Sequence, residues 1–142
     1  MGTALVDSSV LIGAVSARDT HHENAAAILH GVDRGELPTG FVTNYALTET
    51  LNFIHERVGH DTATGFLDRL IESAGFELVH APERDFHTGR SLFRKHTSLA
   101  FGDATMVAYM KRSGIDHIYS FDDDFDAVDG IVRLNVATNP FD

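Results

Sequence analysis

Apolar residues in this chain occur in short unbroken runs that alternate with longer segments in which apolar positions recur every three or four residues. The short runs predict strands at 3–7, 40–43, 76–81, 116–121 and 131–135. The longer segments predict helices at 8–19, 22–35, 44–58, 61–74, 83–96 and 101–114. Such alternation is typical of parallel sheets, so we predict a three-layer α/β/α fold with a mainly parallel central sheet of four to five strands. The segment 131–135 is predicted to be an edge strand.

Residues with particular backbone preferences mark several helix ends. The serines that follow the first strand, and Asn44, suit helix N-caps, and Pro82 suits the start of the fifth helix. Gly59 and Gly114 suit helix ends, because glycine readily adopts a left-handed conformation. These residues predict where each helix begins and ends.

The helix predicted at 44–58 has one apolar face. Leu47, Leu51, Ile54 and Val58 fall within about 60° of one another on a helical wheel. Glu49 lies about 200° from Leu47 on the same wheel. From this pattern alone, Glu49 is predicted to face solvent.

Length and composition restrict the class of protein. A chain of 142 residues, 43% of them hydrophobic, can form one packed core, and we predict a single domain over 1–142. The chain has no cysteine, which excludes disulfides, thiolate metal sites and a cysteine nucleophile. The first apolar run is interrupted by polar residues and no Lys or Arg precedes it, so we predict a cytoplasmic protein without a signal peptide or membrane contact.

The charge balance is strongly acidic. Asp and Glu number 21 against 11 Lys and Arg, which gives a formal net charge of −10. This charge repels a polyanion at long range. A nucleic-acid substrate would therefore have to be bound locally, through metal ions or a small basic patch.

Acidic residues follow two of the predicted strands. Asp7 and Asp122 come just after the runs "ALV" and "HIYSF", and Asp103 begins the helix that leads into the second of these strands. Carboxyl ends of parallel strands share one edge of a sheet, so all three acids are expected there. When Asp103 or Asp122 is taken alone, the favoured interpretation is structural: a favourable charge at a helix start for Asp103 and a turn cap for Asp122. For Asp7, which lies between a buried strand and a helix, a structural and a functional explanation are equally well supported.

Carboxylates gathered at one edge repel one another and need a positively charged partner. Without nearby Lys or Arg, that partner is a hard divalent cation bound through oxygen, and Mg²⁺ or Mn²⁺ is the first candidate. A magnesium site with open water positions binds phosphate oxygens and lowers the pKa of a bound water. The pattern thus indicates phosphodiester hydrolysis.

Four segments in order along nearly the whole chain resemble the motifs of PIN-domain ribonucleases, in particular the VapC-type toxins. These segments are "VDSSVL", "LTETL", "LAFGDATMVAYM" and "SFDDDF". The resemblance carries over Asp7, Glu49, Asp103 and Asp122 as site acids, with Ser8 and Ser120 as supporting hydroxyls and Phe125 as a packing residue. Asp124 is kept as a further supporting acid, because consecutive aspartates leave the register open by a residue or two.

The resemblance implies a metal-dependent endoribonuclease in which the four acids hold Mg²⁺ or Mn²⁺ and position a water for attack on RNA phosphate. It also implies a homodimer and a cognate antitoxin that blocks the site. The inward role of Glu49, the RNA substrate and the antitoxin come from the resemblance and not from the residue pattern.

Several alternatives stay open at this point. A PIN-like domain that only binds partners, and a housekeeping RNA-processing nuclease, share these motifs. A phospho-receiver module also gathers aspartates at strand ends, but its paired acids come early in the chain, whereas the dense acidic run here comes late. Zinc is not expected, because the HExxH spacing is absent, and His21 and His22 are predicted to be exposed or to face the substrate.

Overall fold

The five predicted strands form one sheet in the computed structural model, which describes residues 2–142. They are β1 (Thr3–Val6), β2 (Thr39–Thr43), β3 (Phe76–Val79), β4 (His117–Tyr119) and β5 (Val132–Leu134). Their spatial order is β3-β2-β1-β4-β5, and each neighbouring pair runs parallel. The predicted parallel sheet and the edge position of β5 are therefore confirmed, and β1 is central.

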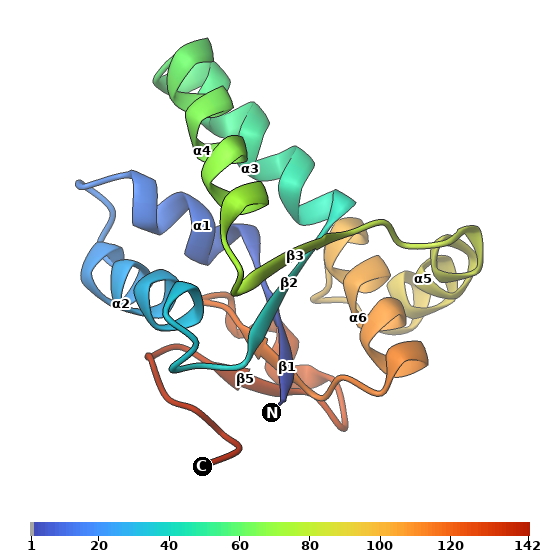
Figure 1. The fold of residues 1–142 in the computed structure, drawn as a ribbon. Helices are drawn as coiled ribbons and strands as arrows, with labels where there is room; N and C mark the ends of the chain where they lie inside the picture. Colours follow the sequence, from blue (N-terminus) through green and yellow to red (C-terminus); the bar gives the residue numbers. More distant parts are fainter. Residues whose placement is uncertain (1) are drawn as a thin grey trace.

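Within residues 2–142, six α-helices surround this sheet. They are α1 (Ser8–Val15), α2 (His22–Asp33), α3 (Asn44–Arg57), α4 (His60–Glu72), α5 (Glu83–Lys95) and α6 (Phe101–Ser113). In Figure 1, α1 and α2 lie on one side of the strands and α5 and α6 on the other, while α3 and α4 pack together and project beyond them. This is the predicted α/β/α arrangement. Every helix of the described residues is too short or too polar to cross a membrane.

The core explains why the central strand reads as an unbroken apolar run. Ala4, Leu5 and Val6 of β1 are fully or almost fully buried, because helices cover both faces of the sheet. A short 3₁₀ helix, η1 (Asp123–Ala127), follows β4 and was not predicted. It turns Phe125 fully into the core, as expected of a packing residue.

Two helix starts differ from the predicted caps. Asp7, and not a serine, is the N-cap residue of α1, and its side chain makes no capping hydrogen bond. The N-cap of α3 is Thr43, whose Oγ1 accepts from the backbone N of Ala46 at 3.3 Å. Asn44 is instead the first helical residue, and its Oδ1 accepts from the backbone N of Ala81 at 2.9 Å. Adjacent polar residues can each suit a cap, and tertiary contacts decide which one does.

The buried face of α3 is also rotated from the predicted one. Ala46, Thr50 and Ile54 are its buried residues, whereas Val58 is 59% exposed. Thr50 hides its hydroxyl by donating to the carbonyl oxygen of Ala46 at 2.7 Å, which lets a polar residue occupy the core.

Close packing of α5 on α6 fixes the start of α6. A Cβ atom added at Gly89 of α5 would lie 2.7 Å from Cγ2 and 3.0 Å from Cα of Thr105. At the other end of α6, Arg112 donates to both carboxylate oxygens of the buried Asp85, at 2.7 and 2.9 Å. Both contacts position the helix that carries Asp103.

We expect Gly89→Ala to destabilise the fold by about 1–3 kcal/mol, because the added methyl group would push α6 away from α5. Gly65→Ala on α4 is the matched control, since nothing lies within 4 Å of its added Cβ, and should be neutral or stabilising by up to about 1 kcal/mol. Urea unfolding of both variants measures the difference. Equal stabilities would contradict the close α5–α6 contact.

Candidate active site

The carboxyl ends of β1 and β4 open onto one hollow. Its lining residues are Asp7, Ser8, Ser9, Ile12, Asp19, His21, Glu49, Ala100, Gly102, Asp103, Phe121 and Asp122. All four acids predicted from the sequence are in this set, although they come from four separate parts of the chain. The parallel topology brings them together.

Asp7 is the most buried of these acids, with 3% of its surface exposed. Its backbone N donates to the carbonyl oxygen of Tyr119 at 3.0 Å, and its own carbonyl accepts from Val10 in the first turn of α1. The chain therefore leaves the sheet and enters the helix at this residue. Its Oδ2 accepts from the hydroxyls of Ser9 and Ser120, both at 2.8 Å.

The same two serines also bind the backbone of the turn after β4. Ser120 Oγ accepts from the backbone N of Asp122 at 3.0 Å, and Ser9 Oγ accepts from the backbone N of Phe121 at 3.1 Å. Each hydroxyl thus donates to the carboxylate and accepts from a main-chain N–H. The start of α1 and the turn that carries Asp122 are held in one hydrogen-bonded unit.

Glu49 reaches the hollow from α3. The Ser8 hydroxyl donates to Glu49 Oε1, while Ser8 Oγ lies 3.5 Å from Asp7 Oδ1. Glu49 is exposed, as the helical wheel predicted, but the surface to which it is exposed is the hollow. It lies about 60° from the buried Ala46 on the helix, so it flanks the buried face.

Asp103 and Asp122 complete the set. Asp103 is half-buried in the first turn of α6. Asp122 caps η1, because its Oδ1 accepts from the backbone N of Asp124 at 3.0 Å, and it lines the hollow as well. The structural and functional interpretations of Asp122 therefore do not exclude each other.

The neighbouring aspartates differ from Asp122 in position. Asp123 and Asp124 are not in the lining of the hollow described above. Within residues 2–142, Asp122, Asp123 and Asp124 do offer carboxylate oxygens that all lie within 4.8 Å of one another. Asp123 is exposed, so this trio resembles a solvated acidic turn more than an enclosed metal site.

The electrostatics of the hollow are unbalanced. Burial raises the pKa of Asp7, hydrogen bonds from Ser120 and Ser9 lower it, and repulsion from Glu49 raises it. The pKa of Asp103 is raised to about 7, first by burial and then by repulsion from Asp7, Asp122 and Glu49. These shifts show that the carboxylates are held against their mutual repulsion.

The donor set suits a hard divalent cation. Of the described side chains that line the hollow, none belongs to Lys or Arg. Arg133 on β5 is engaged elsewhere, since it donates to both carboxylate oxygens of Asp126 and to the carbonyl oxygen of Ser120. Oxygen ligands with excess negative charge are those that Mg²⁺ and Mn²⁺ prefer.

Sequence reasoning missed several lining residues. Ser9 was not singled out, although its place in the first helical turn, two residues after Asp7, could have identified it as a hydroxyl donor. Phe121 directly precedes Asp122, so a side chain next to the site was foreseeable. Asp19 has no comparable signal, because a loop brings it to the hollow. His21 is exposed and lines the hollow, whereas His22 is half-buried and its Nδ1 lies 2.8 Å from the Gly13 carbonyl oxygen.

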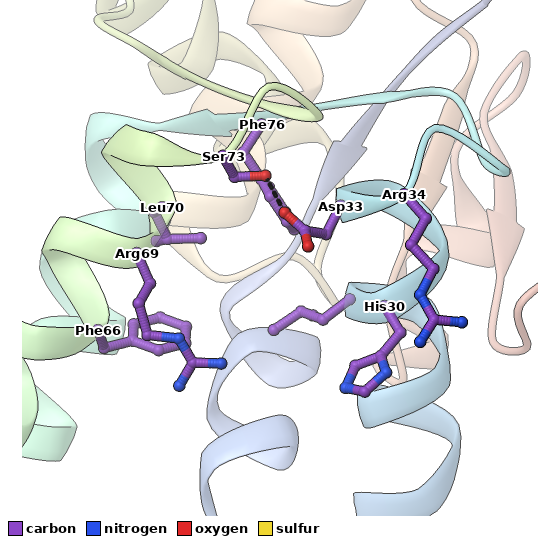
Figure 2. Close-up of a pocket in the computed structure, with 9 residues that line it drawn as sticks. His30, Asp33, Arg34, Phe66, Arg69, Leu70, Ser73 and Phe76 are labelled. Carbon is purple, nitrogen blue, oxygen red and sulfur yellow. Dashed lines mark hydrogen bonds between the residues drawn. The ribbon is translucent and has the colours of Figure 1, made fainter.

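A second hollow lies between α2 and α4, away from the acids. Figure 2 shows Phe66 and Leu70 on the α4 side and His30 and Arg34 on the α2 side, with Arg69 extending into the space between them. A hydrogen bond from Ser73 Oγ to Asp33 Oδ1 joins the ends of the two helices. This groove is lined by apolar side chains and by charged ones among which Arg34 and Arg69 outnumber Asp33, and we call the latter group its basic rim.

Comparison with known proteins gives a family and several relatives. The PIN domain family model matches residues 4–131. A VapC ribonuclease from Archaeoglobus fulgidus is 30% identical over 81 residues, which cover 56% of this chain and 50% of that protein, so the chain matches only half the length of this relative. The 23S rRNA-specific endonuclease VapC20 of Mycobacterium tuberculosis is 28% identical over 130 residues, which cover 91% of this chain and 95% of that protein.

Solved structures with the same fold include toxins. The crystal structure of Mycobacterium tuberculosis VapC20, described as a sarcin-ricin loop cleaving toxin, superposes with a TM-score of 0.75 at 25% identity, over 87% of this chain and 93% of that one. A toxin-antitoxin complex from Klebsiella pneumoniae has a TM-score of 0.65 at 16% identity, over 91% and 95% of the two chains. The second likeness shows the fold alone.

We expect the metal-free protein to lose stability as the pH rises through the pKa of Asp103. That pKa, about 7 in the folded state, lies above the ordinary value of 3.8, so the folded state binds more protons between the two. The contribution of protonated Asp103 to the free energy of unfolding is therefore intact below about pH 4 and is lost as the pH approaches about 7. Because Asn cannot ionise, the stability advantage of Asp103→Asn over wild type should grow across this window in EDTA.

Urea unfolding at a series of pH values measures this difference. Glu49→Gln provides a second test. Removing the charge of Glu49 should lower the pKa of Asp103, so the pH range over which stability is lost should end at a lower pH. A stability difference between wild type and Asp103→Asn that is constant with pH would contradict the assignment.

Proposed function

The chain belongs to the PIN-domain family, and on that premise we propose that it is a VapC-type endoribonuclease, the toxin of a toxin-antitoxin pair. The observation that carries this proposal is the group of four carboxylates around one oxygen-lined hollow. The names of the relatives, a VapC ribonuclease and a 23S rRNA-specific endonuclease, support the reaction class. The substrate is RNA, and the reaction is hydrolysis of a phosphodiester bond.

The proposed ligands of the metal are Asp7, Glu49, Asp103 and Asp122, and the metal is Mg²⁺ or Mn²⁺. When bound, such an ion neutralises phosphate charge and lowers the pKa of a coordinated water. The remaining contributions come from the chain itself. Ser9 and Ser120 donate to Oδ2 of Asp7, and Ser8 Oγ lies 3.5 Å from Oδ1, so hydroxyls near both oxygens orient this carboxylate.

The other carboxylates are oriented in the same way. Ser8 donates to Glu49, and the backbone N of Asp124 donates to Oδ1 of Asp122. Asp124, predicted as a supporting acid, thus contributes through its main chain. Fixed hydrogen bonds of this kind lower the cost of positioning ligands during the reaction.

The proposed protein partner is a cognate antitoxin, and the groove of Figure 2 has chemistry that fits it. Leu29, Phe66, Leu70 and Phe76 offer apolar contacts, while His30, Arg34 and Arg69 lie around them. A basic rim in a chain of net charge −10 favours a partner segment with apolar residues flanked by acids. The groove also continues toward α1, through Ala14 and Val15.

A homodimer is proposed as well, on the basis of aromatic residues at the surface of α5 and α6. Phe86 and Phe93 are 40% and 46% exposed. Both pack edge-on against Phe101, with ring centroids 5.6 Å apart. Two exposed phenylalanines packed on a half-buried third are a feature of association surfaces.

We expect metal-dependent cleavage of RNA that requires the four acids. A mixed RNA pool should be cut with Mg²⁺ or Mn²⁺ and left intact in EDTA, at low and at high salt. Asp7→Asn and Asp103→Asn should reduce the rate at least about 100-fold while preserving the fold, because each substitution keeps the side-chain shape and removes a charge. The control is Asp129→Asn, which changes an exposed acid outside the hollow and should retain activity.

The other proposed identities give different results in this assay. Binding of metal without cleavage in any condition would favour a PIN-domain interaction module. Cleavage without growth inhibition on expression would favour a housekeeping RNA-processing nuclease. Full activity in well-folded Asp7→Asn protein would refute the site.

The antitoxin is identified as the protein that suppresses toxicity on co-expression. We expect Arg69→Glu to weaken its binding by about tenfold or more, which corresponds to about 1.4 kcal/mol. The reversed charge would repel acidic residues of the bound segment. Arg84→Glu is the control, because it makes the same change on the exposed surface of α5. Calorimetry of the three proteins gives the affinities, and an unchanged affinity of Arg69→Glu would exclude this groove as the contact surface.

A further inference from the structure

Two aromatic rings lie parallel at the wall of the acidic hollow. The imidazole of His21 stacks on the phenyl ring of Phe121, with ring centroids 4.3 Å apart and an interplanar angle of 10°. His21 comes from the loop before α2, and Phe121 from the turn after β4. Both line the hollow with the four acids.

This pair of rings is held in place by its surroundings. The backbone N of His21 donates to Asp19 Oδ1 at 2.8 Å, and the backbone N of Phe121 donates to Ser9 Oγ at 3.1 Å. A Cβ added at Gly13 of α1 would lie 3.7 Å from the Phe121 ring, so that ring also packs against α1. The hydrogen bond of Phe121 links the rings to the serine that also binds Asp7.

Core packing does not account for the position of His21. Phe121 is half-buried, but His21 is exposed, so its imidazole adds an aromatic surface that faces the solvent of the hollow. The other polar side chains that line this hollow in the described residues are carboxylates and hydroxyls. His21 is thus, within that lining, the side chain that can offer both a π-face and a hydrogen-bond donor.

Resting on the proposed ribonuclease function, we propose that His21, backed by Phe121, is the subsite that stacks an unpaired RNA base next to the phosphate that is cleaved. Nucleobases stack on aromatic side chains irrespective of their sequence, and only unpaired bases expose the required face. The substrate is therefore single-stranded or looped RNA at the cut. His21 is a binding residue in this assignment, and the carboxylates perform the chemistry.

Variants at His21 separate stacking from other roles. On a short single-stranded RNA with a mapped cut, His21→Ala should lower kcat/KM by about 5-fold to 150-fold, the range that corresponds to losing one stacked base. His21→Phe should retain most of the activity, because it keeps the π-face and loses the donor. His60→Ala is the control, since it removes an exposed histidine outside the hollow.

An abasic nucleotide placed on either side of the cut identifies the contact. If His21 stacks on that base, removing the base should lower the kcat/KM of wild type by the same factor as the His21→Ala substitution does on intact RNA. Removing the base should then not lower the kcat/KM of His21→Ala any further. The proposal would be overturned if His21→Ala lowered kcat/KM relative to wild type by the same factor on intact and on abasic RNA, and also lowered the melting temperature of the protein. That result would mean that the rings only stabilise the loop before α2. No loss on the intact RNA would also overturn it.

Binding of a fluorescent RNA tests stacking without cleavage. With Mg²⁺ and in the Asp103→Asn background, which is expected not to cut, single-stranded RNA that contains 2-aminopurine should be quenched by protein with His21 or His21→Phe, but not by His21→Ala, and duplex RNA should show no such difference. If the protein binds and quenches this RNA but cuts none with metal present, the nuclease proposal fails and the stacking site stands. If cleavage occurs but quenching does not depend on His21, the stacking site fails and the nuclease stands.

Discussion

The buried carboxylate of Asp7 is the constraint on which the rest of the site depends. A carboxylate with 3% exposure is costly unless its oxygens are satisfied. Two hydroxyls, those of Ser9 and Ser120, satisfy Oδ2, and the same hydroxyls accept main-chain N–H groups of the turn after β4. The polar requirement of one buried group therefore joins the first strand and helix to a turn more than a hundred residues later, and it places Asp122 beside Asp7.

Charge repulsion at this edge opposes folding, and the surrounding scaffold offsets it. Residues 104–110 of α6 are all buried, although Asp103 at the start of the same helix carries a pKa raised to about 7. The close approach of Gly89 to Thr105, two residues after Asp103, and the Asp85–Arg112 pair at the other end of α6 hold this helix against α5. Apolar packing at one part of a helix thus supports an unfavourable charge at its end, which is typical of functional sites.

The parts of this arrangement that could be predicted follow from local patterns. Apolar runs and their spacing predicted the parallel sheet, and because strand ends share one edge, they predicted that Asp7 and Asp122 would lie close together. The position of Glu49 in the hollow could not be predicted in this way. Helical periodicity identifies the buried face of α3, but it does not show which part of the fold lies next to the residues that flank this face. Composition also could not choose among Asp122, Asp123 and Asp124, because the 3₁₀ turn that distinguishes them depends on Phe125 entering the core. The pairing of His21 with Phe121 depends on long-range topology and has no local signal. The single-domain assignment and the proposed roles of the acids stay predictions.

The acidic character of the chain sets how RNA can be selected. Nucleases with basic surfaces gain affinity from phosphate contacts that carry no sequence information. A net charge of −10 removes most of that non-specific term, so affinity has to come from contacts inside the hollow and from bound cations. Such contacts act over a few ångströms and form only when the RNA presents the right shape. Because non-specific affinity for RNA is low, each local contact contributes more to selectivity. The exposed ring of His21 lies beside the carboxylates, where contact with a single base could decide which phosphate stays bound long enough to be cut.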